Sequence, residues 1–61
     1  MATKTPVIEI YRDPAGDWRW RLQARNGEVL ASGEGYKTQA GAQRGAVAFK
    51  RNAAAAVVVL T

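Results

Sequence analysis

Apolar and polar side chains alternate along "WRWRLQA", residues 18–24, which is the pattern of a β-strand with one buried face. A second run, "VIEIY" at residues 7–11, is rich in β-branched side chains, and "DPAG" between the two has the composition of a turn. The two runs therefore predict an antiparallel hairpin. Its apolar face would carry Ile8, Ile10, Trp18, Trp20, Leu22 and Ala24, and its polar face Glu9, Tyr11, Arg19, Arg21, Gln23 and Arg25.

Asn26-Gly27 predicts a second hairpin, because a two-residue type I′ turn requires positive φ at both central positions. Such a turn would fix the register of a third strand and add opposite-charge pairs to the polar face. The expected pairs are Arg25 with Glu28, Ala24 with Val29, Leu22 with Ala31, and Arg19 with Glu34.

The hydrophobic period changes to that of a helix after Thr38, whose side chain can cap the N-terminus. A stripe of mostly small side chains then recurs at helical spacing, with Lys50 and Arg51 expected in the last turn. Gly41 and Gly45 disfavour a helix, and a close approach to the sheet would compensate for them. The stripe consists of Ala42, Ala46, Phe49 and Ala53.

"VVVLT", residues 57–61, suits a strand better than the end of a helix, and its lack of alternation predicts that both faces are covered. The predicted fold class is therefore α+β, a β-β-β-α-β unit in which one helix packs on one face of an antiparallel meander. Residues 1–61 are expected to form a single domain, with a flexible N-terminus at residues 1–6.

The composition limits the cross-links and metal sites that the chain can form, because it contains neither cysteine nor histidine. Disulfides are excluded, zinc and copper sites lack their usual ligands, and we expect no metal and no cofactor. A domain of this size has a marginal core, so it needs very good packing or a partner subunit. The N-terminus does not resemble a signal peptide, the apolar C-terminus is too short to span a membrane, and we expect a cytoplasmic location with no membrane partner.

The sequence does not favour an enzyme, because no histidine or cysteine can act as base or nucleophile and the carboxylates do not cluster. "GEGYKT", residues 33–38, lacks the spacing of a phosphate-binding loop, and helix capping by Thr38 is the favoured interpretation.

The chain has a net charge of +4, with nine basic and five acidic side chains, and two readings of its basic residues remain open. The polar sheet face is either a solvated, ion-paired surface or a weak, mainly sequence-nonspecific nucleic-acid site. The candidate anion or nucleic-acid contacts are Arg19, Arg21, Arg25 and Lys37.

Taken together, the "WRWRL" strand, the "NG" turn, the "GEGY" stretch and the capped helix ending "KRNA" resemble the YegP-like family of small bacterial proteins. The resemblance implies β(3)-α-β units that occur as tandem repeats or as two subunits, with C-terminal strands swapped across one sheet. Because one unit is present here, it implies a homodimer. It implies no activity and no catalytic residue, and leaves a protein-interaction module as the leading expectation.

The residues themselves also favour self-association, because "VVVLT" has no polar face and would be an aggregation-prone edge if left exposed. The alanine run at residues 53–56 contains no turn signal that would return the chain to its own sheet. The expected dimer interface comprises Val57, Val58, Val59 and Leu60, held by swapping or by side-by-side pairing.

Overall fold

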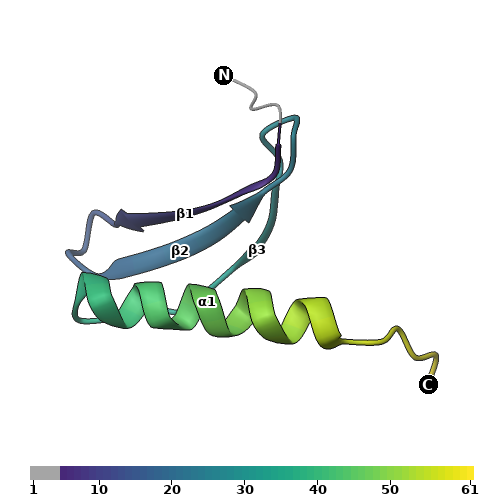
Figure 1. Ribbon diagram of the computed structural model, residues 1–61. Helices are drawn as coiled ribbons and strands as arrows, with labels where there is room; N and C mark the ends of the chain where they lie inside the picture. The colour runs from purple at the N-terminus through teal and green to yellow at the C-terminus, as the bar shows by residue number, and fades with distance from the viewer. Residues whose placement is uncertain (1–4) are drawn as a thin grey trace.

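The structure is a computed structural model that describes residues 5–61, and it shows an α+β fold in two layers (Figure 1). Strands β1 (Val7–Arg12), β2 (Trp18–Gln23) and β3 (Val29–Ser32) form an antiparallel sheet in the order β1-β2-β3. Helix α1 (Gln39–Ala55) packs along one face, against β1 and β2. The expected meander with one covering helix is confirmed. The expectation of a flexible residue 1–6 segment falls largely on residues 1–4, outside the described part.

The register of β1 and β2 confirms the predicted faces of the first hairpin. Ile10 lies opposite Trp20, and Tyr11 lies opposite Arg19. Apolar side chains thus meet across the strands on the face that α1 covers, while tyrosine, glutamate and arginine side chains share the other face.

The turn predicted at Asn26-Gly27 is wrong in type. Gly27 has positive φ (+88°), but no residue other than glycine does so among those described, so the type I′ geometry is not formed. The Gly27 N–H donates to the Ala24 carbonyl (2.9 Å), and Ala24 pairs with Glu28 instead of Val29. This is a three-residue loop closed by a left-handed glycine, and Arg25 lies inside it and does not pair with Glu28. The β1–β2 loop has the same pattern, closed by Gly16.

A β-bulge nevertheless restores the predicted register farther along β3. Gln23 pairs with Val29, but Leu22 pairs with Ala31 as expected, so Leu30 is the extra residue. The expected pairing of Arg19 with Glu34 is wrong. Gly33 donates to the Trp20 carbonyl while Trp18 pairs with Tyr36, so a second irregularity displaces Glu34 from a position opposite Arg19.

The core is small and centres on Trp20, which is 6% exposed. The only other buried apolar residues among those described are Ala42 and Ala46, on the side of α1 that faces the sheet. The Trp20 ring lies 4.5 Å from the Phe49 ring, centroid to centroid. A Cβ built at Gly33 would come within 2.0 Å of the Trp20 indole nitrogen, so the indole needs a residue without a side chain at that position.

Helix α1 begins as predicted, because the Thr38 hydroxyl accepts a hydrogen bond from the Gly41 N–H (3.0 Å). It continues to Ala55, which leaves Lys50 and Arg51 before the last turn, so the expected complement to the helix dipole is wrong. The close approach that compensates for Gly45 comes from Tyr36, whose hydroxyl would lie 2.1 Å from a Cβ there. The glycine therefore accommodates the connection between β3 and α1 rather than a strand.

No strand forms at the C-terminus within one chain, in contrast to the expected fourth strand. Beyond Ala55 the described residues have no regular secondary structure, and they continue past α1 and away from the sheet (Figure 1). Val57, Val58, Val59 and Leu60 are 70–102% exposed. A strand requires a neighbour for its hydrogen bonds, and the segment reaches none in its own chain. We call residues 56–61 the tail.

Replacing the central indole should destabilise the protein strongly. Trp20→Ala is expected to lower the free energy of unfolding by about 3–5 kcal/mol, because it leaves a cavity where a large aromatic side chain was buried. Urea denaturation followed by circular dichroism at one fixed chain concentration measures this. Trp18→Ala, which removes a half-buried indole, is the control and should cost less. Equal losses would contradict the central role of Trp20.

Candidate functional site

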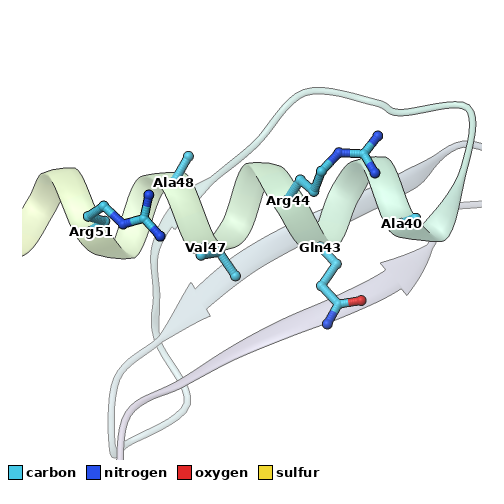
Figure 2. Close-up of a pocket in the computed structure, with 6 residues that line it drawn as sticks. All are labelled: Ala40, Gln43, Arg44, Val47, Ala48 and Arg51. Carbon is cyan, nitrogen blue, oxygen red and sulfur yellow. The ribbon is translucent and has the colours of Figure 1, made fainter.

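Two shallow hollows flank helix α1. The first, which we call the α1 groove, has a volume of about 510 Å³ and is lined by Ala40, Gln43, Arg44, Val47, Ala48 and Arg51 (Figure 2). The second, the β1 groove, lies between β1 and α1 and has two adjoining parts of about 470 and 210 Å³. Two polar residues, Gln43 and Lys50, line it together with a larger apolar set: Pro6, Ile8, Ile10, Leu22, Ala46, Val47, Phe49 and Ala53.

The structure brings together two of the four predicted basic contacts. Arg19 and Arg21 lie on the face of β2 opposite α1, as the alternation predicts. Arg25 lies in the loop that follows β2, whereas Lys37 follows Tyr36, which pairs with Trp18 at the start of β2. Arg25 and Lys37 therefore lie at opposite ends of the strand, and the four side chains do not form one patch.

Arg21 is engaged by two neighbours on β1. Its guanidinium binds the Glu9 carboxylate, with 2.5 Å between Nη2 and Oε1, and lies over the Tyr11 ring, 4.5 Å from the ring centroid. Both partners come from the adjacent strand, so register alone positions them. The ion pair and the cation–π contact hold the guanidinium against the sheet.

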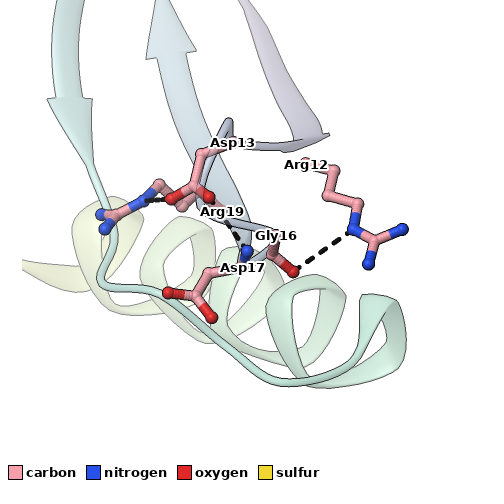
Figure 3. A network of polar contacts seen from close by, with 5 residues as sticks. All are labelled: Arg12, Asp13, Gly16, Asp17 and Arg19. Atoms are coloured by element: carbon pink, nitrogen blue, oxygen red, sulfur yellow. Dashed lines mark hydrogen bonds and ion pairs between the residues drawn. The ribbon is translucent and has the colours of Figure 1, made fainter.

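Arg19 is engaged by the β1–β2 loop. Its Nε donates to Asp13 Oδ2 (2.5 Å), and the Asp17 N–H donates to the other oxygen of the same carboxylate (2.9 Å; Figure 3). The Asp13 side chain is 11% exposed. The hydrogen bond from Arg19, followed by that from the backbone of Asp17, lowers the pKa of Asp13, and the same ion pair raises the pKa of Arg19.

The sequence pattern assigns Asp13 only to a turn and does not predict its ion pair with Arg19. A signal was present, because a three-residue hairpin loop closed by glycine brings the residue before the loop beside the start of the next strand. Asp13 thus serves the loop and β2 together. Arg12 adds a bond from its Nε to the Gly16 carbonyl (3.2 Å), which ties the same loop to the end of β1.

The remaining candidate features are structural. Thr38 caps α1, which agrees with the favoured interpretation of residues 33–38. Within residues 5–61, no group of three or more acidic side chains is placed to hold a metal ion. The described part of the chain contains no helix that is long and apolar enough to cross a bilayer.

Comparisons with known proteins give a consistent result. The family described as "Domain of unknown function (DUF1508)" matches residues 13–59. A UPF0339 protein of Agrobacterium fabrum is 49% identical over 85% of this chain and 84% of its own, and one of Treponema denticola is 47% identical over 85% and 90%. A solution structure of a protein from Haloferax volcanii superposes with a TM-score of 0.80 at 38% identity, covering 97% of this chain and 100% of that one.

The ion pair of Asp13 predicts a loss of stability in acid. A carboxyl whose pKa is lower in the folded than in the unfolded chain stabilises the fold above its usual value of 3.8, and that contribution disappears as the pH falls through the folded pKa. We therefore expect the unfolding free energy to fall below about pH 4, and to fall less in Asp13→Asn.

Urea denaturation at a series of pH values between about 2 and 6 measures this dependence. The control is Glu34→Gln, which removes a carboxylate that makes no ion pair among the described residues. If both variants flattened the profile equally, the contribution of Asp13 would be refuted.

Proposed function

We propose that this protein, which belongs to the DUF1508 or UPF0339 family, is a non-catalytic interaction module that acts as a homodimer. The resemblance to the YegP-like family is confirmed, since it is the same family of proteins. The family description assigns no activity, and the chain contains no histidine or cysteine that could act as base or nucleophile. A cytoplasmic location belongs to the same proposal and rests on the absence of cysteine.

The exposed apolar tail is the observation that carries the proposal. Val57–Leu60 present four large aliphatic side chains to solvent, next to a domain in which only three apolar residues are buried among those described. Each such side chain gains roughly 1.5–3 kcal/mol on full burial. A second copy of the chain offers that burial while adding to a marginal core.

The β1 edge is the better acceptor for a partner's tail. β1 is an edge strand with six residues in regular register, and the apolar β1 groove opens beside it. The other edge, β3, has four residues and a bulge at Leu30, a device that opposes further strand pairing. A tail paired with β1 would place alternate side chains in the groove and satisfy the open edge.

The geometry favours an exchange between chains over a return to the same chain. The tail continues past α1 and away from its own sheet (Figure 1). Helix α1 extends through Ala53–Ala55, so no turn separates the helix from the start of the tail. Ala56 is in an extended conformation (φ −71°, ψ 148°), which continues the chain outward. A second copy related by a two-fold axis would receive this tail and return its own.

Sedimentation equilibrium of the intact chain at micromolar concentration should give a folded species of about twice the monomer mass of 6.6 kDa. Removing residues 57–61 should give a poorly folded or aggregating chain, because the β1 groove and edge lose their cover. Val58→Lys, which keeps the chain length, should shift the equilibrium toward monomer. A well-folded monomer of the intact chain would refute the dimer.

The edge can be identified within the same assembly. In a dimer mixed from labelled and unlabelled chains, isotope-filtered nuclear Overhauser spectra should connect the tail methyl groups of one chain to Ile8 and Ile10 of the other. Cross-peaks to Val29 and Leu30 would instead place the tail on β3. The two sets of methyl groups lie on opposite edges of the sheet, so the results are mutually exclusive.

Nucleic-acid binding by the sheet face remains the alternative. The contact of Arg21 with Tyr11 supports it, because basic and aromatic side chains on a sheet are used to bind single-stranded RNA. The ion pairs of Arg19 and Arg21 weaken it, since a phosphate would have to displace Asp13 and Glu9.

If the alternative holds, Arg19→Gln with Arg21→Gln should abolish salt-sensitive binding to a mixed oligonucleotide pool. Arg44→Gln with Arg51→Gln is the matched control, because it removes the same charge from the other layer. If the sheet face is only solvated, the first pair should change the unfolding free energy by under about 1 kcal/mol, the scale of exposed ion pairs. Oligonucleotide binding unaffected by the first pair would eliminate the sheet face as the site.

A further inference from the structure

The positive charge of helix α1 has no counterpart within the described chain. Arg44, Lys50 and Arg51 are exposed, and residues 39–55 contain no acidic side chain. The two ion pairs in the described part both belong to the sheet and its β1–β2 loop. An exposed surface of one sign attracts a partner of the other.

The α1 groove adds an apolar floor to this charge. Arg44 and Arg51 are seven residues apart, which places them on one side of the helix, two turns or about 10 Å from each other. Val47 and Ala48 lie between the two guanidinium groups along the axis (Figure 2). Val47 is 48% exposed, and Ala40 extends the floor toward the start of the helix.

We propose that the α1 groove docks an acidic amphipathic helix of another protein. The matching segment carries two carboxylates seven residues apart, with an apolar side chain between them. Its helical rise reproduces the spacing of Arg44 and Arg51, so each carboxylate meets one guanidinium. The intervening apolar side chain then lies on Val47, and the small side chains of Ala40 and Ala48 let the two helix axes approach closely.

The chemistry of the surface favours a peptide over a nucleic acid. The groove offers no aromatic ring on which a base could stack, and its floor between the arginines is aliphatic. Arg44 and Arg51 are not held by acidic neighbours, unlike Arg19 and Arg21, so their planar guanidinium groups are available for two-pronged bonds to carboxylates. The α1 groove shares Gln43 and Val47 with the β1 groove, but Arg44 and Arg51 line the α1 groove alone. The paired charge therefore lies outside the surface proposed for the tail, and this inference goes beyond the proposed dimer.

Fluorescence anisotropy with the full-length chain tests the proposal. The probe is a labelled, alanine-rich helical peptide of about 18 residues, with two glutamates seven positions apart and leucine between them. Binding is expected, and replacing both glutamates by glutamine should weaken it. Arg44→Gln and Arg51→Gln should each reduce affinity roughly fivefold, the upper range for an exposed ion pair. Arg25→Gln, which removes the same charge from the β2–β3 loop, should leave it unchanged.

Charge reversal supplies the decisive comparison. Arg44→Glu with Arg51→Glu should lose the glutamate peptide and bind the version with lysine at the same two positions. Circular dichroism checks that each variant keeps its helix. The proposal is overturned if the glutamate peptide does not bind, if its glutamine version binds equally well, or if the lysine peptide fails to rescue the reversed helix. It is also overturned if a mixed oligonucleotide of about 12 nucleotides binds more tightly through the same two arginines.

Discussion

The packing of Trp20 between sheet and helix is the constraint on which the rest of the fold depends. Trp20, on the central strand, is the one large side chain among the buried apolar residues of the described chain, and the residues buried beside it are small. Gly33 on the neighbouring chain segment provides room for the indole nitrogen, and Ala42 and Ala46 are the buried positions of α1. Phe49 completes the contact from the helix. The alanine stripe of the helix is thus the complement of one large side chain.

The two layers handle charge differently. On the sheet, arginines alternate with apolar residues, and the neighbouring strand and loop supply carboxylates within reach of both Arg19 and Arg21. On α1, the basic residues stand without acidic neighbours in the same helix. The net charge of +4 is therefore carried more by the helix than by the arginine stripe that dominates the sequence. Electrostatic attraction to a partner depends on such unpaired charge rather than on the number of arginines.

The small core and the exposed tail have the same consequence, which is that a single chain buries little apolar surface. A chain of 61 residues without disulfides has few ways to add buried apolar surface. Four of its large aliphatic residues lie outside the folded unit in a single chain, while the apolar β1 groove lies open beside an edge strand. An unfilled groove and an uncovered tail are complementary in chemistry, and the proposed exchange between two copies joins them.

The sequence by itself determined the three strands of the meander, their faces, the helix start and the placement of Arg19 and Arg21 on the outer face. Period-two alternation and the Thr38 cap are local signals, and each depends only on neighbouring residues. Tertiary structure decided the rest. Three local features together set the register between β2 and the chain that follows it: the turn at Gly27, the bulge at Leu30 and the second irregularity before Tyr36. Because each reflects a weak local preference, no single dipeptide specifies that register. For that reason Arg19 does not pair with Glu34 as the sequence predicts, and it forms an ion pair with Asp13 instead. The tail has a strand's composition but no strand within one chain, because a strand exists only where another backbone completes its hydrogen bonds.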